Sequence, residues 1–185
     1  MSEIIVVTGL PRSGTSLMMQ ILEKVPLEIM TDNLRKSDVN NPEGYYELEA
    51  VKGIVKNNQF LRDCQGKVVK IVAPLIQFIA LEHTYRVIFM RRNMEEILMS
   101  QEKMLGKDQS SEREKFNTIY NLHLKKTSEF LIVNQIPFVE VEYRELITNT
   151  ELEIDKVLQF LNFKGDKQLL INQVNSSYYR NRSKS

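Results

Sequence analysis

The stretch IIVVTGLPRSGTSLMMQIL, residues 4–22, contains the pattern that decides the fold. It begins with a continuous apolar and β-branched run, which is typical of a strand covered on both faces. Gly9 and Gly14 then mark a short loop, and the apolar residues among positions 17–25 fall on one helical stripe that ends at Pro26. The stretch therefore predicts a strand, a loop and a helix in direct succession.

A loop in this position is suited to bind phosphate. Backbone N–H groups converge at the start of a helix, the helix dipole favours negative charge there, and glycine lets the backbone approach the anion closely. In loops that bind ATP or GTP, a lysine reaches the phosphates, but Thr15 stands at its place here. Because Arg12 supplies a cation inside the loop, we predict an anion-binding loop of a different kind.

Further apolar or β-branched segments predict the rest of a sheet. Counted with the first, they span residues 3–8, 27–30, 67–72, 85–90 and 137–143, with helical patterns between them. This alternation predicts an α/β fold with a mostly parallel central sheet of about five strands flanked by helices. Ligands in such folds gather beyond the carboxyl ends of the strands.

Three of the helical patterns have clear boundaries. Asn93 with Glu96, and Thr150 with Glu153, have the spacing of capping boxes at helix starts. Residues 112–134 predict a long helix with a polar face.

Composition favours a single compact domain over residues 1–185. The chain has 42% apolar and 26% charged residues, and a chain of this length buries enough surface to fold without disulfides or a structural metal. The single cysteine, Cys64, excludes a disulfide within the chain and a multi-cysteine zinc site, and it indicates a reducing compartment. We expect Cys64 to be a small buried hydrophobic residue.

The charge balance excludes some partners. Lys plus Arg count 25 against 24 Asp plus Glu, so nucleic acid is not an expected partner. We identify no signal peptide and no apolar stretch that approaches the ~20 residues of a transmembrane segment. The expected location is cytoplasmic.

The loop sequence also carries a family resemblance. PRSGTS closely resembles the 5′-phosphosulfate loop of sulfotransferases that use 3′-phosphoadenosine 5′-phosphosulfate (PAPS), which have Arg or Lys at the position of Arg12. The resemblance implies a P-loop nucleotide-binding fold of the sulfotransferase type. It also implies that the donor is bound by Pro11, Arg12, Ser13, Gly14, Thr15 and Ser16.

Two later segments resemble the same family. VIFMRRN at residues 87–93, with Ser100 eight residues after Arg92, resembles the 3′-phosphate motif, and Arg91 is a neighbouring cation. A guanidinium and a hydroxyl are suitable donors to a phosphate. The stretch at 137–163 resembles the family's strand, turn and following helix, and it implies that Tyr143 contacts adenine. It departs from the common pattern at residues 144–145 and 162.

Lys70 lies inside an apolar strand, where an ammonium is costly to bury unless it meets an anion or emerges at the strand end. Its position matches a family lysine that stabilises the transferring sulfuryl group. In the cytosolic hormone and phenol branch of the family, a histidine base lies two residues later, but Val72 stands there. His83 precedes a strand at the wrong end for the site, and His123 lies mid-helix.

A carboxylate is the better candidate for the general base. NNPEGYYE at residues 40–47 resembles the NPxGxxE stretch of bacterial and carbohydrate-type sulfotransferases, in which an acidic residue is a proposed base. Glu47 matches best, and Glu43 and Asp32 are alternatives. Residues 28–62 should line the site of the acceptor, which could be a sugar, a lipid, a peptide or a small alcohol.

The resemblance implies sulfuryl transfer from PAPS to a hydroxyl or amine by in-line displacement, with catalytic roles for Arg12, Lys70 and Glu47 and with no metal. A basic tail containing Arg180 could close over the 3′-phosphate. Two alternatives stay open. One is a divergent P-loop nucleotide kinase or phosphatase, and the other is a nucleotide-binding module without catalytic activity.

Overall fold

A computed structural model describes residues 2–32, 34–38 and 44–175. Its strands are β1 (Ile4–Gly9), β2 (Ile29–Met30), β3 (Val68–Lys70), β4 (Tyr85–Arg91) and β5 (Phe138–Glu142). All five lie within or next to the predicted segments. They form one parallel sheet in the order β2-β3-β1-β4-β5, so the prediction of a parallel α/β fold is confirmed.

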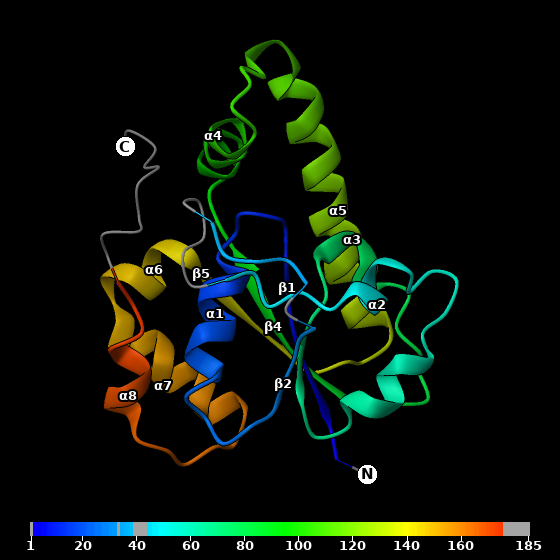
Figure 1. Ribbon diagram of the computed structural model, residues 1–185, viewed down its shortest axis with the longest axis vertical. Helices are drawn as coiled ribbons and strands as arrows, with labels where there is room; N and C mark the ends of the chain where they lie inside the picture. The colour runs from blue at the N-terminus through cyan, green and yellow to red at the C-terminus, as the bar shows by residue number, and fades with distance from the viewer. Residues whose placement is uncertain (1, 33, 39–43, 176–185) are drawn as a thin grey trace.

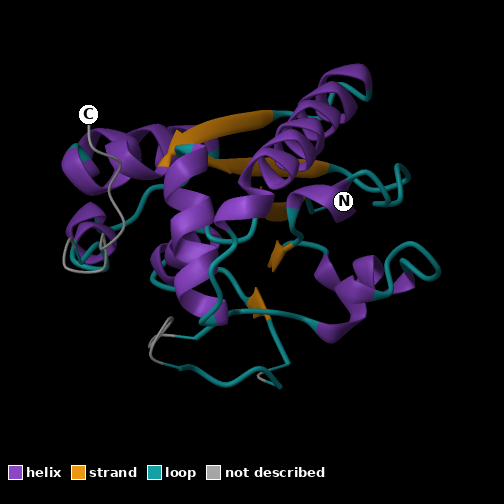
Figure 2. Cartoon of the chain, turned by 90° about the horizontal axis from the view of Figure 1, so that it is seen from above, coloured by secondary structure: helices purple, strands orange, loops and turns teal. Residues whose placement is uncertain are grey.

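Helices follow the strands and cover both faces of the sheet (Figures 1 and 2). The α-helices are α1 (Thr15–Leu22), α2 (Glu49–Lys52), α3 (Ala73–Ile76), α4 (Met94–Leu105), α5 (Arg113–Val133), α6 (Tyr143–Thr148), α7 (Thr150–Phe160) and α8 (Lys167–Ile171). Two short 3₁₀ helices, η1 (Gln59–Cys64) and η2 (Ser110–Glu112), complete the described elements.

Successive side chains of β1 point to opposite faces of the sheet, and each face has its own hydrophobic core. Ile4 and Val6 pack with residues of α3 and α5 on one face, whereas Ile5 and Val7 pack with residues of α1, α7 and α8 on the other. All six residues of β1 are buried, as expected for a central strand of a sheet covered on both faces.

Two helix starts show how far the capping predictions hold. The Asn93 side chain accepts a hydrogen bond from the backbone N–H of Glu96 at 3.3 Å, so the predicted cap of α4 is confirmed. The prediction for α7 is wrong by one residue: Asn149 is the N-cap, and Thr150 is the first helical residue. The Thr150 hydroxyl donates to the carbonyl of Ile147 in the preceding turn, and the backbone carbonyl of Asn149 already accepts from Glu153 N.

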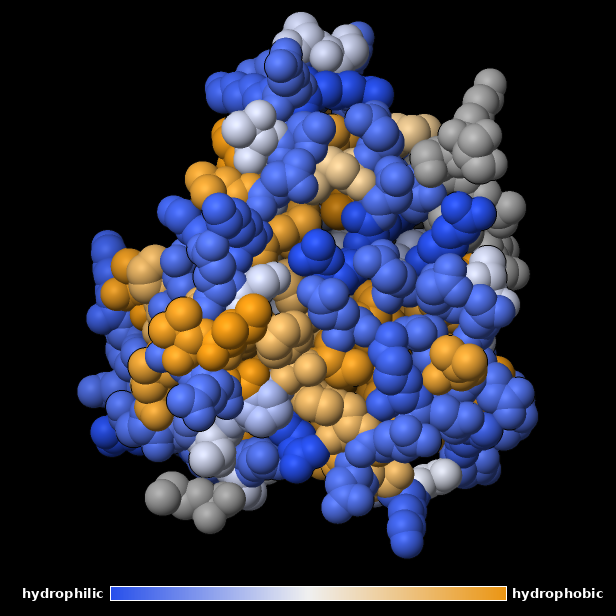
Figure 3. All heavy atoms as spheres, turned by 180° about the vertical axis from the view of Figure 1, so that it is seen from behind, coloured by the Kyte–Doolittle hydropathy of each residue, from blue (hydrophilic) through white to orange (hydrophobic). Residues whose placement is uncertain are grey.

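Cys64 is fully buried in the core, as predicted, and burial raises the pKa of its thiol to about 11. The face behind the view of Figure 1 is mostly hydrophilic, with apolar areas between the hydrophilic residues (Figure 3). Within the described residues, no helix is both long enough and apolar enough to cross a membrane.

The parallel direction of the strands determines where a site can form. The carboxyl ends of β1, β3 and β4 meet at one edge of the sheet, and α4 and the start of α5 extend beyond this edge (Figure 1). The loop at 9–16 follows β1 at this edge, and Lys70 is the last residue of β3. Because β1 and β3 are adjacent strands, the predicted donor-binding loop and Lys70 lie next to each other.

Candidate functional site

The loop after β1 has a backbone that depends on small residues. A Cβ at Gly9 would lie 2.5 Å from Ser13 Oγ and 2.7 Å from the carbonyl oxygen of Met90, so only glycine fits there. Gly14 has φ +98° and is the N-cap of α1, and Arg12 also has a positive φ, of 71°. The strand, loop and helix predicted from residues 4–22 are thus confirmed.

The loop offers several donors to an anion. The first N–H groups of α1 have no partner within the helix, and no acidic residue lies in its first turn to compete for its positive end. Thr8 Oγ1 and Ser13 Oγ are buried and have no hydrogen-bond partner among the described residues. Buried hydroxyls without a partner are uncommon and indicate a ligand or water in the complete site.

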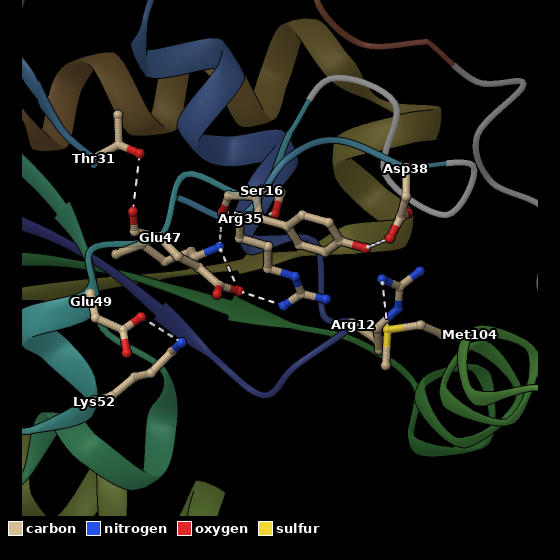
Figure 4. Close-up of polar contacts among 11 residues, drawn as sticks. Arg12, Ser16, Thr31, Arg35, Asp38, Glu47, Glu49, Lys52 and Met104 are labelled. Atoms are coloured by element: carbon tan, nitrogen blue, oxygen red, sulfur yellow. Dashed lines mark hydrogen bonds and ion pairs between the residues drawn. The ribbon is translucent and has the colours of Figure 1, made fainter. Parts of the chain in front are cut away.

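The Arg12 side chain joins the loop to α4. Its Nε donates to Ser100 Oγ at 2.9 Å, and its Nη1 lies 3.7 Å from Met104 Sδ (Figure 4 shows the second contact). Burial lowers the pKa of Arg12, and the nearby positive charges of Arg92 and Arg35 act in the same direction. Two predicted donor-binding residues that lie 88 positions apart are therefore in direct contact.

Arg92 contacts the backbone of the loop through a buried side chain, which is 7% exposed. Its Nη1 donates to the carbonyl oxygen of Arg12 at 3.0 Å, and its Nε pairs with Glu96 Oε2 at 3.0 Å. Its guanidinium also lies over the ring of Tyr143, 4.3 Å from the centroid. Arg91 is separate from this group, because it pairs with Glu140 at 3.7 Å and is 28% exposed.

Tyr143 is also placed against the loop and is 6% exposed. A Cβ at Gly14 would lie 2.4 Å from Cδ2 of its ring. The structure therefore brings Tyr143 and Arg92 to the loop, where both contact its backbone.

Lys70 is buried at the carboxyl end of β3, 6% exposed. Its ammonium donates to the carbonyl oxygen of Tyr45 and lies 3.9 Å from Glu47 Oε1, and Ser16 Oγ donates to the same Tyr45 oxygen at 3.5 Å. Burial lowers the pKa of Lys70 to about 8, Glu47 opposes this shift, and Arg35 adds to it. Lys70 thus meets an oxygen at the strand end, as its burial requires.

The third part of the site is the β2–α2 segment, the described residues among 31–48. Arg35 Nη1 donates to Glu47 Oε1 at 2.8 Å, and the Arg35 guanidinium lies over the Tyr45 ring, 3.4 Å from its centroid (Figure 4). The Tyr45 hydroxyl donates to Asp38 Oδ2 at 2.7 Å. Arg35 and Asp38 were not among the site residues predicted from the sequence, where their only signal is their place in the segment expected to line an acceptor site.

The alternative bases differ in position. Asp32 accepts hydrogen bonds from the backbone N–H groups of Leu34 and Glu49, which lower its pKa and make it an anchor of the segment. Glu43 lies outside the described residues, as does Arg180 of the predicted tail. Of the two described carboxylates, Asp32 and Glu47, it is Glu47 that pairs with Lys70.

The histidines lie elsewhere. His83 precedes β4 at the amino edge of the sheet and contacts Gln65 Nε2 through its Nδ1 at 3.0 Å. His123 is on α5, where burial lowers its pKa. In the part of the chain that the structure describes, no group of three His, Cys, Asp or Glu side chains is arranged to hold a metal ion.

A parallel sheet whose first strand enters a glycine-containing loop and a helix defines the class of P-loop α/β folds. Within this class, the chain belongs to the sulfotransferase domain family, whose model matches residues 2–185. The family predicted from PRSGTS is therefore confirmed. No curated protein matches the sequence.

Solved structures share the fold at low sequence identity. Mouse sulfotransferase SULT7A1 in complex with PAP is 12% identical with a TM-score of 0.60, over 98% of this chain and 66% of that one. Sulfotransferase STF9 from Mycobacterium avium is 10% identical with a TM-score of 0.56, over 98% of this chain and 69% of that one. A sugar kinase from Janibacter is 12% identical with a TM-score of 0.50, over 96% of this chain and 98% of that one. The chain thus spans 66% of the length of the mouse protein.

Proposed function

We propose that the protein is an enzyme that transfers the sulfuryl group of PAPS to a hydroxyl or amine acceptor and releases adenosine 3′,5′-bisphosphate (PAP). The observation that carries the proposal is the hydrogen bond from Arg12 Nε to Ser100 Oγ. It brings the loop motif and the second donor motif together in a chain that belongs to the sulfotransferase domain family. The complex of mouse SULT7A1 with PAP supports the choice of donor.

The donor would lie along the loop. In the proposal, Arg12 and the backbone N–H groups of residues 13–16 bind the 5′-phosphosulfate, since they are at the positive end of α1. Arg92 and Ser100 select the 3′-phosphate, and Tyr143 contacts adenine. These roles are supported by the contacts of the four side chains with the loop or with one another.

Transfer needs a cation for the sulfuryl oxygens and a base for the acceptor. In the proposal, Lys70 stabilises the sulfuryl group while a new bond forms from the acceptor oxygen or nitrogen to sulfur and the bond to the 5′-phosphate oxygen breaks. The phosphate keeps the electron pair of the broken bond, and Glu47 accepts the proton of the acceptor. The 3.9 Å separation of Lys70 Nζ and Glu47 Oε1 supports this pairing of roles.

The kinase alternative predicts binding of ATP or GTP with Mg²⁺. Thr15 stands where such loops carry the lysine that reaches the phosphates, which argues against that alternative. A module without activity would bind PAP but show no turnover with any acceptor. A panel of alcohols, glycans, lipids and peptides, assayed with PAPS, separates that alternative from an enzyme and identifies the acceptor class.

Calorimetric titration tests the donor directly. We expect PAP to bind equally well with Mg²⁺ and with EDTA, and ADP to bind more weakly in both. Binding of ADP only in the presence of Mg²⁺ would favour the kinase alternative.

The two neighbouring arginines offer a matched pair for the 3′-phosphate. We expect Arg92→Ala to reduce the preference for PAP over AMP, which lacks the 3′-phosphate, by about tenfold or more. Arg91→Ala should leave this preference unchanged, because Arg91 pairs with Glu140 outside the loop. Because Arg92 also bonds the Arg12 carbonyl, the ratio of the two affinities is the decisive measurement. An unchanged ratio in Arg92→Ala would assign Arg92 to loop support alone.

We further propose that residues 1–185 form one domain and that the protein acts in the cytoplasm. The first proposal is supported by the arrangement of the described elements around one sheet. The second rests on the single buried cysteine.

A further inference from the structure

Three cations from three separate parts of the chain meet at the site. Arg12 comes from the loop, Lys70 from the end of β3 and Arg35 from the β2–α2 segment (Figure 4 shows Arg12 and Arg35). Arg35 Nη1 and Lys70 Nζ approach the same oxygen, Glu47 Oε1, at 2.8 and 3.9 Å. The two cations are therefore close neighbours.

The positive charges repel one another. The charge of Arg35 lowers the pKa of both Arg12 and Lys70, which adds to the effect of their burial. The carboxylate of Glu47, between Arg35 and Lys70, and the charge of Asp38 near Arg12 offset part of this repulsion. Because Lys70 is 6% exposed, water screens the remaining repulsion poorly, and a bound anion relieves it further.

Arg35 contacts Tyr45 and Glu47 but keeps donors for a ligand. Its guanidinium carbon lies over the Tyr45 ring, and the Tyr45 hydroxyl donates to Asp38. Among the described residues, only Glu47 accepts a hydrogen bond from Arg35, which has five N–H groups. Its side chain is 44% exposed, so the remaining N–H groups are accessible.

The backbone of Tyr45 links the loop and the strand next to the Arg35–Glu47 pair. Its carbonyl oxygen accepts hydrogen bonds from both Lys70 Nζ and Ser16 Oγ. Loop and strand donors thus already converge on one oxygen atom beside Arg35.

We propose that Arg35 is a further substrate-contacting residue, which binds the sulfuryl oxygens of PAPS together with Arg12 and Lys70. The inference rests on the proposed function and adds a residue to it. When Arg35 turns to the sulfuryl oxygens, Glu47 loses its shortest ion pair and its Oε1 is available to the proton of the acceptor. Donor binding thereby prepares the base, while the bonds that form and break stay those of the transfer described above.

The two nucleotides PAP and PAPS differ by the sulfuryl group alone, so their affinities test this contact without an acceptor. We expect Arg35→Met to weaken PAPS binding by about tenfold or more in calorimetry and to change PAP binding by less than about twofold. Arg35→Lys keeps the charge but loses the planar guanidinium with its paired N–H donors. It should weaken PAPS binding by a factor between those of the unmodified protein and Arg35→Met. Lys52→Met is the matched control, because Lys52 pairs with Glu49 on α2 and both side chains are exposed.

Each outcome decides a different question. Equal weakening of PAP and PAPS in Arg35→Met would mean that Arg35 only supports the segment, and no change in either would also overturn the inference. Unchanged PAP binding shows that the variant is folded. If the unmodified protein binds neither nucleotide, the proposed function itself is wrong, and the inference falls with it.

Discussion

The loop at 9–16 and the β2–α2 segment at 31–48 line the same edge of the sheet but are held differently. Ser13 and Thr15 of the loop are 1% and 6% exposed, and buried Arg92 and Tyr143 contact its backbone. The β2–α2 segment is buried at Tyr45, whose carbonyl oxygen accepts from Lys70, but its ion pair is more open, since Arg35 and Glu47 are 44% and 28% exposed.

The difference has an energetic consequence. Buried contacts that fit closely are costly to disturb, whereas an ion pair between exposed side chains contributes about 1 kcal/mol or less. We therefore expect the loop to be preformed for the donor, and the segment to change its contacts when substrates bind. Substitutions in the two regions test this contrast.

Arg12→Ala should have the largest effect, on turnover. Loss of one charge contact of this kind costs roughly 2.7–4 kcal/mol of transition-state stabilisation, so turnover should fall at least about a hundredfold. The measurement is steady-state kinetics with PAPS and the acceptor found in the panel. Turnover close to that of the unmodified protein would remove the loop from the mechanism.

Gly14→Ala should damage the preformed loop. The new Cβ would meet the Tyr143 ring at 2.4 Å in a backbone with φ +98°, so the loop has to shift. We expect weaker PAP binding by about tenfold and a free energy of unfolding lower by about 1–3 kcal/mol, measured by calorimetry and urea unfolding.

Gly106→Ala is the control for this substitution. Gly106 also has a positive φ, of 61°, but a Cβ there meets no atom within 4 Å. It should lower stability by about 1 kcal/mol and leave PAP binding unchanged. Equal PAP binding in both variants would contradict a preformed loop.

Lys70 lies between the loop and the β2–α2 segment, and its titration should be visible in the pH dependence of catalysis and of stability. Its pKa in the folded protein without donor is about 8, below its ordinary value of 10.5, so kcat/KM for PAPS should fall above about pH 8 as Lys70 of the free enzyme loses its charge. The unfolded chain binds more protons between these two values, so the free energy of unfolding should rise with pH from about 8 to about 10.5, relative to Lys70→Met. Identical slopes in the two proteins would mean that Lys70 titrates normally.

Tyr45→Phe should have the smallest effect. It removes the hydrogen bond to Asp38 but keeps the ring under Arg35, so stability should fall by about 1 kcal/mol or less. We expect faster proteolysis within residues 31–48 and unchanged PAP binding. Equal protection of both regions in the variant would argue against a loosely held segment.

The sequence predicted the elements whose signals are local. The central strands are continuous apolar runs, the loop has its glycines at the required places, and the motifs carry Arg12, Arg92, Ser100 and Lys70 to the same edge. These features follow from residue type and from the direction of parallel strands.

The remaining features depend on tertiary contacts. The pairing of Arg35 with Glu47 depends on the path of a segment with almost no secondary structure, and the support of Arg12 by Arg92 depends on residues 80 positions apart. The cap of α7 was misplaced because Asn149 and Thr150 are both suitable N-cap residues, and the preceding turn decides between them.

At Arg12, which has a left-handed backbone conformation, selection for stability and selection for activity favour different residues. A residue with a Cβ is strained at φ 71°, and glycine adopts this conformation without strain. A library screened only for heat resistance should therefore enrich Arg12→Gly, and one screened for sulfuryl transfer should retain arginine. Directed evolution for heat resistance alone would therefore select against the arginine that the proposed sulfuryl transfer needs.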